Sequence, residues 1–281
     1  MPHAVEDRTL EGPHGAFAVR LYRPAEPTGV GLVWAHGGGF AGGDLDMPEG
    51  HWVAGQLAER GVTVVSVDYM LSPVPQGWTM PPAGNARERR HYPAASEEVG
   101  FAFAWALESG LAEGPWTLGG ASAGGNLAAG AALRMLHAGA SLPALVVLAY
   151  PTLQAVQAEP DTALRALLDA QPDADRFAPA IIREMYENYL GGPVETADAY
   201  AIPGIATTAQ LMDFPPVLMI NGEADELRMS GEAFAHSLAE AGVAVEAVTE
   251  RGTQHGHLNR PDEPAASLSI ERIAAALSAL S

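Results

Sequence analysis

A glycine-rich segment, residues 119–126, constrains this chain more than any other stretch. It reads Gly-Gly-Ala-Ser-Ala-Gly-Gly-Asn and is followed by an Ala- and Leu-rich run without proline at residues 126–139. This order predicts a strand that turns sharply into a helix, with the hydroxyl of Ser122 exposed at the bend. Gly120 and Gly124 agree with this prediction, because a tight turn leaves no room for a Cβ beside the serine. The motif alone is also typical of a glycine-rich helix start, so this candidate nucleophile needs partners elsewhere.

The composition indicates a folded globule and excludes several kinds of chemistry. Hydrophobic residues make up 48% of the 281 residues, enough to bury a sizeable core, and the periodicity favours one large domain over two small ones. The formal net charge is -19 and no residue is a lysine, so nucleic acid and anionic membrane surfaces are unfavourable partners. Without cysteine, the chain can form neither a disulfide, nor a thiol nucleophile, nor a thiolate metal site.

The amino-terminal residues carry no targeting signal. They read Met-Pro-His-Ala-Val-Glu-Asp, without a basic stretch and an apolar run, and no window is apolar over the length of a membrane span. We therefore expect a cytoplasmic protein with no membrane partner. The scattered His51, His91 and His137 lack the spacing of metal ligands, so no metal or other cofactor is predicted. The sequence leaves monomer and homodimer open.

Apolar runs and amphipathic stretches alternate along most of the chain. Strands are predicted at residues 16–22, 29–35, 62–67, 116–119, 144–149, 217–220 and 243–248. Helices are predicted at residues 49–60, 94–109, 126–139, 231–241 and 265–280. The order implies an α/β fold, a mostly parallel and doubly wound sheet of about eight strands flanked by helices. Ligands of such sheets bind at the carboxyl ends of the strands.

The alternation stops at residues 152–204, where the sequence predicts a helical insertion. Its two helices are expected at residues 161–169, with an aspartate at the cap, and at residues 179–190. We interpret the insertion as a small cap or lid above the sheet. The second helix has an apolar stripe that includes Tyr186 and Tyr189, and this stripe either packs on the main domain or lines a pocket.

Residues 70–91 form a second irregular segment. They contain four prolines and the cluster Arg-Glu-Arg-Arg at residues 87–90, which predicts a long flap loop. The arginines of this flap are expected to be solvated, with contact to an acidic substrate as the alternative.

The predicted strand ends carry polar groups with complementary chemistry. After three different strands come Ser122, then Glu223, Asp225 and Glu226, and then His255 and His257. A serine needs a neutral imidazole to accept its proton, and the imidazole needs a carboxylate to fix its tautomer. An earlier strand ends at residues 36–39, His-Gly-Gly-Gly, where bare backbone N–H groups can approach an anion.

These residues resemble the hormone-sensitive-lipase-like branch of the α/β-hydrolases, which includes bacterial carboxylesterases. The likeness covers about residues 33–261. The family's His-Gly-Gly-Gly loop matches residues 36–39, and its Gly-x-Ser-Ala-Gly-Gly-Asn elbow matches residues 120–126. Its Asp-x-Leu-Arg segment matches residues 225–228, and its His-Gly segment matches residues 255–256. Only 35 residues precede the glycine loop, so the amino-terminal part of the family's cap is expected to be reduced.

The resemblance implies a role for each matched residue. Ser122 is the expected nucleophile, Asp225 the orienting acid and His255 the base, while Glu223, Glu226 and His257 remain alternatives. The oxyanion hole is expected to use the backbone N–H groups of Gly38, Gly39 and Ala123, with Gly37 as a fallback, and His36 would hold the glycine loop. The expected substrate contacts are Phe40, Tyr69, Tyr186 and Tyr189.

The resulting hypothesis is a serine carboxylesterase that acts on small, short-acyl esters through an acyl-enzyme. An amidase or lactonase with the same triad is the alternative. A small-molecule receptor of the same fold would require a damaged triad, and the sequence retains all three members.

Overall fold

The computed structural model describes residues 3–80, 87–174 and 176–281. Its centre is an eight-stranded sheet with the order β1-β2-β4-β3-β5-β6-β7-β8. The strands are β1 (His3–Gly12), β2 (Gly15–Pro24), β3 (Gly31–Ala35), β4 (Thr63–Val67), β5 (Trp116–Ala121), β6 (Val146–Ala149), β7 (Val217–Ala224) and β8 (Val245–Gln254). Strands β3 to β8 pair in parallel, and β1 and β2 are antiparallel. The predicted mostly parallel sheet is confirmed.

Strand β1 is absent from the sequence prediction. It pairs with β2 along its whole length at the edge of the sheet, and most of its side chains are exposed. Leu10 is buried in the core, whereas Glu6, Asp7 and Arg8 are charged. An exposed edge strand with so few apolar positions lacks the pattern that identifies strands, and its charges discourage pairing with another edge.

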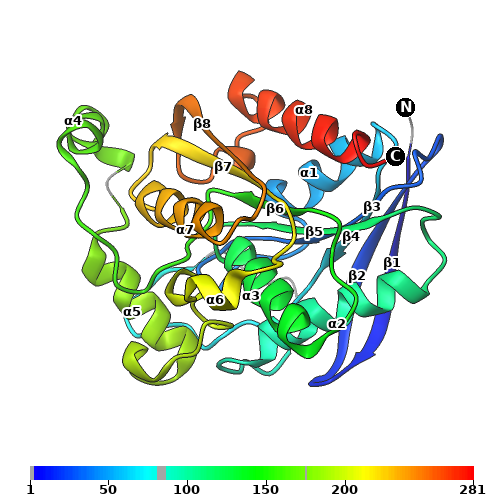
Figure 1. Ribbon diagram of the computed structural model, residues 1–281, viewed down its shortest axis with the longest axis horizontal. Coiled ribbons are helices and arrows are strands. Elements are labelled where there is room, and N and C mark those ends of the chain that lie inside the picture. The colour runs from blue at the N-terminus through cyan, green and yellow to red at the C-terminus, as the bar shows by residue number, and fades with distance from the viewer. Residues whose placement is uncertain (1–2, 81–86, 175) are drawn as a thin grey trace.

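Helices cover both faces of the sheet (Figure 1). One face packs on α1 (Pro48–Ala58) and α8 (Pro264–Ser278), with Trp34 and Leu57 in that layer. The other packs on α2 (Ala94–Glu108), α3 (Ala123–Ala138) and α7 (Arg228–Glu240), with Val33 and Leu127 in that layer. Alternate residues of the central strands thus face opposite layers, which explains why these strands are continuously apolar.

Between β6 and β7 the chain forms α4 (Thr162–Ala170), α5 (Pro179–Leu190) and α6 (Thr208–Leu211). Short 3-10 turns are η1 (Pro172–Ala174), η2 (Val194–Thr196), η3 (Pro203–Ile205) and, after β8, η4 (His257–Asn259). Asp161 caps α4 by accepting a hydrogen bond from the N–H of Leu164 at 2.8 Å, so the predicted aspartate cap is present.

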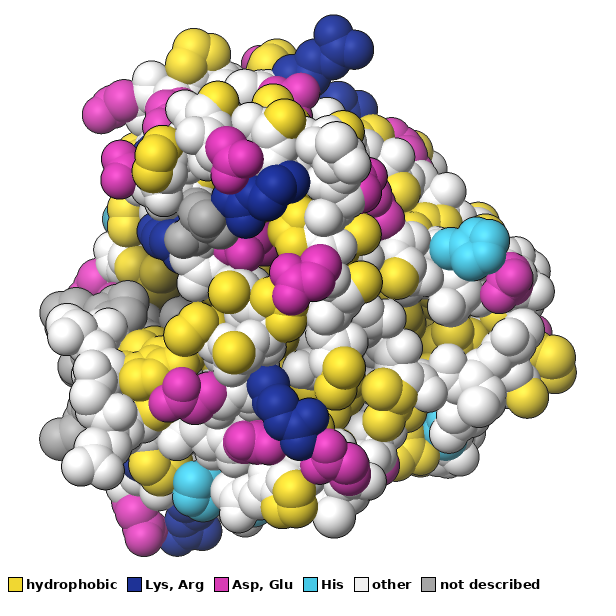
Figure 2. Space-filling model, turned by 90° about the vertical axis from the view of Figure 1, so that its left-hand side faces the viewer, with side chains coloured by type: hydrophobic (Ala, Val, Ile, Leu, Met, Phe, Trp, Pro, Cys, Tyr) yellow, Lys and Arg dark blue, Asp and Glu magenta, His cyan; other side chains and the backbone are white. Residues whose placement is uncertain are grey.

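Helices α4 and α5 lie on the left in Figure 1, at the opposite end from the β1–β2 hairpin. Figure 2 looks onto the face that they form, where acidic side chains are scattered among hydrophobic ones. Among the described residues, no helix combines the length and the apolar character needed to span a membrane.

Two arginines of the 70–91 segment are anchored, so the expectation that they are solvated is wrong for these two. Arg87 pairs with the fully buried carboxylate of Glu98, with 2.5 Å between Nη2 and Oε1. Arg89 donates to the carbonyl oxygens of Ala41 at 2.7 Å and Ser72 at 2.8 Å. A guanidinium that has this many acceptors within the protein serves to hold the loop, and residues 81–86 of the flap lie outside the described residues.

Candidate active site

The turn from β5 into α3 has the sharp geometry that the glycine motif predicts. Ser122 has φ 53° and ψ -118°, a conformation that non-glycine residues rarely adopt. A Cβ on Gly120 would lie 2.4 Å from the carbonyl carbon of Gly124, and one on Gly124 would lie 2.1 Å from the carbonyl oxygen of Ala35. Both glycines are therefore required by sterics, and the serine is held at the carboxyl end of a central strand.

Ser122, His255 and Asp225 form one hydrogen-bonded chain. His255 Nε2 lies 2.9 Å from Ser122 Oγ, and His255 Nδ1 lies 2.8 Å from Asp225 Oδ2. Because an ionised carboxylate only accepts hydrogen bonds, Nδ1 carries the proton and Nε2 is left to accept the serine proton. Asp225 is fully buried, and its Oδ1 accepts from the N–H of Leu227 at 2.9 Å, which fixes the carboxylate.

The alternative acids and the alternative histidine lie elsewhere. The carboxylate of Glu223 accepts from the N–H of Gly252 at 2.7 Å. That of Glu226 accepts from the N–H of Phe177. His257 Nε2 lies 2.8 Å from Ser269 Oγ in α8, which ties η4 to that helix. Of the candidates from the sequence, the structure thus brings Asp225 and His255 together with the serine.

The glycine loop after β3 lies next to the serine, since a Cβ on Gly37 would be 3.0 Å from Ser122 Cβ. Gly38 has φ 114° and Gly39 has φ 59°, values that favour glycine. Within the described parts of the chain, no group accepts a hydrogen bond from the N–H of Gly38, Gly39 or Ala123. The N–H of Gly37 instead donates to Glu49 Oε1 at 2.6 Å, so the fallback oxyanion donor is already engaged.

His36 supports this loop and is not placed as a base. Its Nδ1 lies 2.7 Å from the carbonyl oxygen of Gly37, and its ring stacks on Tyr69 with centroids 4.5 Å apart. Burial lowers the pKa of His36 to about 4, and the pKa of His257 is lowered to about 4 for the same reason. Both imidazoles are therefore neutral near pH 7.

The four expected substrate contacts are fully buried. The hydroxyl of Tyr69 donates to the carbonyl oxygen of His36 at 2.8 Å, and that of Tyr186 donates to Asn126 Oδ1 at 2.8 Å. Phe40 and Tyr189 stack with centroids 4.0 Å apart. None of these side chains presents surface in this structure. Their observed role is packing beneath the site, and contact with a substrate stays a prediction.

Two residues near the site were not predicted from the sequence. Phe177, between η1 and α5, packs its ring against that of His255 with centroids 4.5 Å apart. Glu49, at the start of α1, is 2% exposed and lies beneath the glycine loop. An exposed position is the ordinary expectation for a glutamate at a helix start, and neither residue belongs to a motif.

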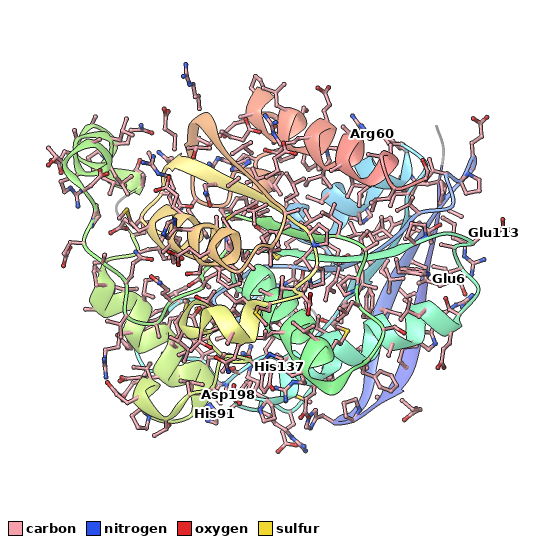
Figure 3. The ribbon with its side chains drawn as sticks, viewed as in Figure 1. Glu6, Arg60, His91, Glu113, His137 and Asp198 are labelled. Carbon is pink, nitrogen blue, oxygen red and sulfur yellow. The ribbon has the colours of Figure 1, made fainter. Side chains whose placement is uncertain are left out.

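The other histidines lie apart from the site. His91 Nδ1 lies 2.7 Å from the carbonyl oxygen of Asn188, and His137 Nδ1 lies 3.0 Å from the hydroxyl of Tyr200. Figure 3 shows His91, His137 and Asp198 in the lower part of the molecule. Across the described residues, no group of three or more potential ligands could hold a metal ion.

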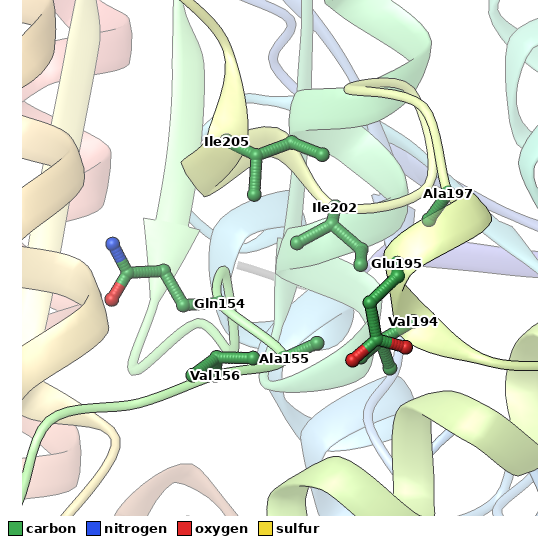
Figure 4. A pocket seen from close by; sticks show the side chains of 8 residues that line it. All are labelled: Gln154, Ala155, Val156, Val194, Glu195, Ala197, Ile202 and Ile205. Atoms are coloured by element: carbon green, nitrogen blue, oxygen red, sulfur yellow. The ribbon is translucent and has the colours of Figure 1, made fainter.

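A separate cavity of about 280 Å³ is lined mainly by residues of the 152–204 segment (Figure 4). It is lined by Gln154, Ala155, Val156, Val194, Glu195, Ala197, Ile202 and Ile205, and none of these belongs to the Ser122 site.

Comparison with known families supports the fold. The family described as alpha/beta hydrolase fold matches residues 32–81 and 85–259. The chain is 32% identical over 269 residues to the carboxylic ester hydrolase LipN of Mycobacterium tuberculosis, covering 91% of this chain and 64% of LipN. It is 31% identical to the esterase LipI of that organism, over 90% of this chain and 75% of LipI. It is 30% identical to an ethyl acetate hydrolase of Pseudomonas putida, over 90% of this chain and 76% of that protein.

Solved structures show the same architecture. A hyperthermophilic esterase of the archaeon Pyrobaculum calidifontis superposes with a TM-score of 0.81 at 31% identity, covering 99% of this chain and 84% of that one. Brefeldin A esterase, described as a bacterial homologue of human hormone-sensitive lipase, superposes with a TM-score of 0.82 at 26% identity. The match covers 98% of this chain and 76% of that one. The chain therefore belongs to the α/β-hydrolase fold family, among its hormone-sensitive-lipase-like carboxylesterases.

Proposed function

We propose that the chain hydrolyses small, short-acyl carboxylic esters with Ser122 as nucleophile, His255 as general base and Asp225 as orienting acid. The observation that carries the proposal is the continuous chain from Ser122 Oγ through both ring nitrogens of His255 to Asp225 Oδ2, with distances of 2.9 and 2.8 Å. A nucleophile, a base and an orienting group within hydrogen-bond reach are the parts that acyl transfer needs.

The reaction follows from this geometry. His255 accepts the hydroxyl proton as Ser122 attacks the ester carbonyl, and Asp225 stabilises the imidazolium that forms. The N–H groups of Gly38, Gly39 and Ala123 stabilise the negative charge on the tetrahedral intermediate. The imidazolium then protonates the leaving alcohol, and a water molecule that gives its proton to the same histidine releases the acid from the acyl-enzyme.

The short-acyl preference rests on side chains that close over the glycine loop. A Cβ placed on Gly39 would lie 3.5 Å from Met185 Sδ and 3.4 Å from Met80 Cε. Two methionine side chains thus border the Cα of Gly39, and they limit the room for a long acyl chain on this side of the glycine loop. The relative named ethyl acetate hydrolase agrees with a short acyl group.

The 152–204 segment is proposed to act as the lid of this site. Phe177 packs on His255, and Arg176 Nη2 lies 3.4 Å from the carbonyl oxygen of His255. Helix α5 contributes Met185 above the glycine loop. One insertion thus covers both the base and the oxyanion donors, which would exclude water from the reacting ester.

The test is hydrolysis of p-nitrophenyl esters from acetate to dodecanoate, with Ser122→Ala as the control. We expect the highest kcat/KM for acetate to butyrate, and a loss of about 10⁴-fold or more in the variant. A diethyl phosphate adduct on Ser122 after treatment with diethyl p-nitrophenyl phosphate would identify the nucleophile. An intact protein without that adduct and without ester turnover refutes the proposal, and turnover of anilides or lactones in preference to esters would favour the amidase or lactonase alternative.

A further inference from the structure

Glu49 is a buried carboxylate that the triad mechanism leaves unused. It is 2% exposed, and no arginine or histidine of the described chain forms an ion pair with it. Its backbone is fixed as well, because its carbonyl oxygen accepts from Trp34 Nε1 at 2.9 Å and its N–H donates to Asn259 Oδ1 at 3.1 Å. A buried charged group with no ion-pair partner is costly, so its retention at this place needs a reason.

Three donors converge on this carboxylate. Oε1 accepts from the N–H of Gly37 at 2.6 Å. Oε2 accepts from the hydroxyl of Tyr150 at 2.6 Å and from Asn259 Nδ2 at 3.0 Å. A backbone N–H and an amide NH₂ can only donate, so these contacts suit the ionised form. Burial raises the pKa of Glu49, and the hydrogen bonds from Tyr150 and Gly37 oppose that rise.

The carboxylate is connected to both halves of the proposed site. Gly37 is adjacent to the oxyanion donor Gly38, and a Cβ on Gly37 would lie 2.4 Å from Glu49 Oε1 and 3.0 Å from Ser122 Cβ. Tyr150 donates to Glu49 and packs its ring edge-to-face on His255, with centroids 5.0 Å apart. Tyr150 thus lies between the carboxylate of Glu49 and the imidazole of His255 and contacts both groups.

We propose that Glu49 is a positioning residue of the ester-hydrolase site, which holds the Gly37 peptide so that the next two N–H groups face the oxyanion and stabilises the imidazolium of His255 by its charge. The inference rests on the proposed function, because it assigns a role within that reaction. Asp225 remains the group that bonds to the imidazole, and Glu49 acts indirectly, through Gly37 and Tyr150.

Other charged and titratable groups also face His255 and set the background for a pH effect. The elements packed around His255 contribute the following groups: Asp225, Ser122, Tyr150, His257, Arg176 and Arg260. Arg176 and Arg260 each lie 3.4 Å from the carbonyl oxygen of His255, and neither donates to the imidazole ring. A neutral substitution at residue 49 leaves all of these groups in place.

The test compares Glu49→Gln with Glu59→Gln, an exposed glutamate that follows the same helix. For p-nitrophenyl acetate we expect kcat to fall roughly tenfold in E49Q with KM within about twofold, because positioning acts in the transition state. The acidic limb of kcat/KM should move to lower pH, because the imidazolium loses a stabilising charge. E59Q should match the wild type in all three quantities.

Tyr150→Phe supplies a second test that keeps the ring against His255. It removes one donor to Glu49, so we expect a smaller fall in kcat, and the double variant E49Q/Y150F should lose no more than E49Q alone because the two residues act as one unit. Thermal unfolding and circular dichroism verify that each variant is folded.

An acidic limb that does not move in folded E49Q overturns the inference, whatever the change in kcat. If E49Q does not fold, the comparison is made with Glu49→Asp and Tyr150→Phe. Losses of kcat that add in the double variant then overturn the inference. A wild-type protein that neither hydrolyses esters nor is labelled at Ser122 refutes the proposed function itself, which is a different result.

Discussion

The ring of Phe177 packs edge-to-face on the ring of His255, with centroids 4.5 Å apart and planes at 65°. The two residues are 78 positions apart and belong to different structural units, one to the 152–204 segment and one to the loop after β8. Tyr150 packs on the same imidazole with centroids 5.0 Å apart. The orientation of the base therefore depends on two aromatic neighbours as well as on Asp225.

Phe177→Ala should lower kcat by about two- to tenfold, because an edge-to-face aromatic pair contributes about 0.5 to 1.5 kcal/mol beyond its burial. Steady-state kinetics with p-nitrophenyl acetate measures the effect. Ile181→Ala is the matched control, since Ile181 is in the same segment, on α5, and is 37% exposed. Equal kcat values for the two variants would contradict a role for Phe177 in holding the base.

Met185→Ala should extend the range of acyl groups that the site accepts. Removing the side chain whose sulfur lies 3.5 Å from the Cβ position of Gly39 opens space beside the oxyanion donors. We expect the ratio of kcat/KM for hexanoate over acetate to rise about tenfold, as a few methylenes of added room allow. Met212→Ala, at a residue that is 56% exposed, should leave the ratio unchanged. An unchanged ratio in M185A would place the acyl group elsewhere.

Gly124→Ala should destabilise the protein by about 3 kcal/mol or more, because a Cβ there meets backbone oxygen and no side-chain movement relieves the overlap. The nearest atoms are the carbonyl oxygens of Ala35 at 2.1 Å and His36 at 2.4 Å. Gly100→Ala in the middle of α2 is the control, since its Cβ would find only Ala131 Cβ at 4.0 Å. That variant should gain about 0.5 to 1 kcal/mol in urea unfolding, from helix propensity.

Arg87→Ala should cost about 3 to 5 kcal/mol of unfolding free energy, because it leaves the carboxylate of Glu98 buried without its cation. Glu98 is fully buried and also accepts from the N–H of Met70 at 2.7 Å. Arg90→Ala removes an exposed pair with Glu88 from the same cluster and should cost less than about 1 kcal/mol. Similar losses in urea unfolding would mean that the Arg87 pair contributes no more than the exposed one.

Acid should destabilise the fold through His257. Its pKa falls from 6.5 to about 4 on folding because it is buried, so the unfolded chain binds the proton more readily between those values. The contribution of neutral His257 to the free energy of unfolding is fully present above pH 6.5. About 3 kcal/mol of it is lost as the pH falls toward 4. His257→Gln, which keeps a nitrogen near Ser269, should show a loss between pH 7 and 4.5 that is smaller by about 2 to 3 kcal/mol. If the free energy of unfolding falls equally with pH in the wild type and the variant, His257 is not the group responsible.

The sequence alone predicted the parts of the fold that depend on local chemistry. The apolar runs at β3, β4 and β7 identified buried strands because both faces of a parallel sheet are covered. Helix α5 was predicted with its observed bounds, since a proline begins it and a glycine in the left-handed conformation ends it. The glycines on both sides of Ser122 likewise predicted a tight turn after a strand, because the steric need for glycine at such a turn is a local property.

Tertiary structure alone decided what lies beside what. Whether Asp225 or a neighbouring glutamate meets His255 depends on how β7 and β8 end, because β7 continues to Ala224 and β8 to Gln254, beyond the predicted ends. Burial of Glu49 and the contact of Phe177 with the base arise from chain segments far apart in sequence, and no local pattern records such contacts. The sequence by itself thus determined the strand order along the chain and the reactive groups, whereas long-range packing selected which groups share hydrogen bonds.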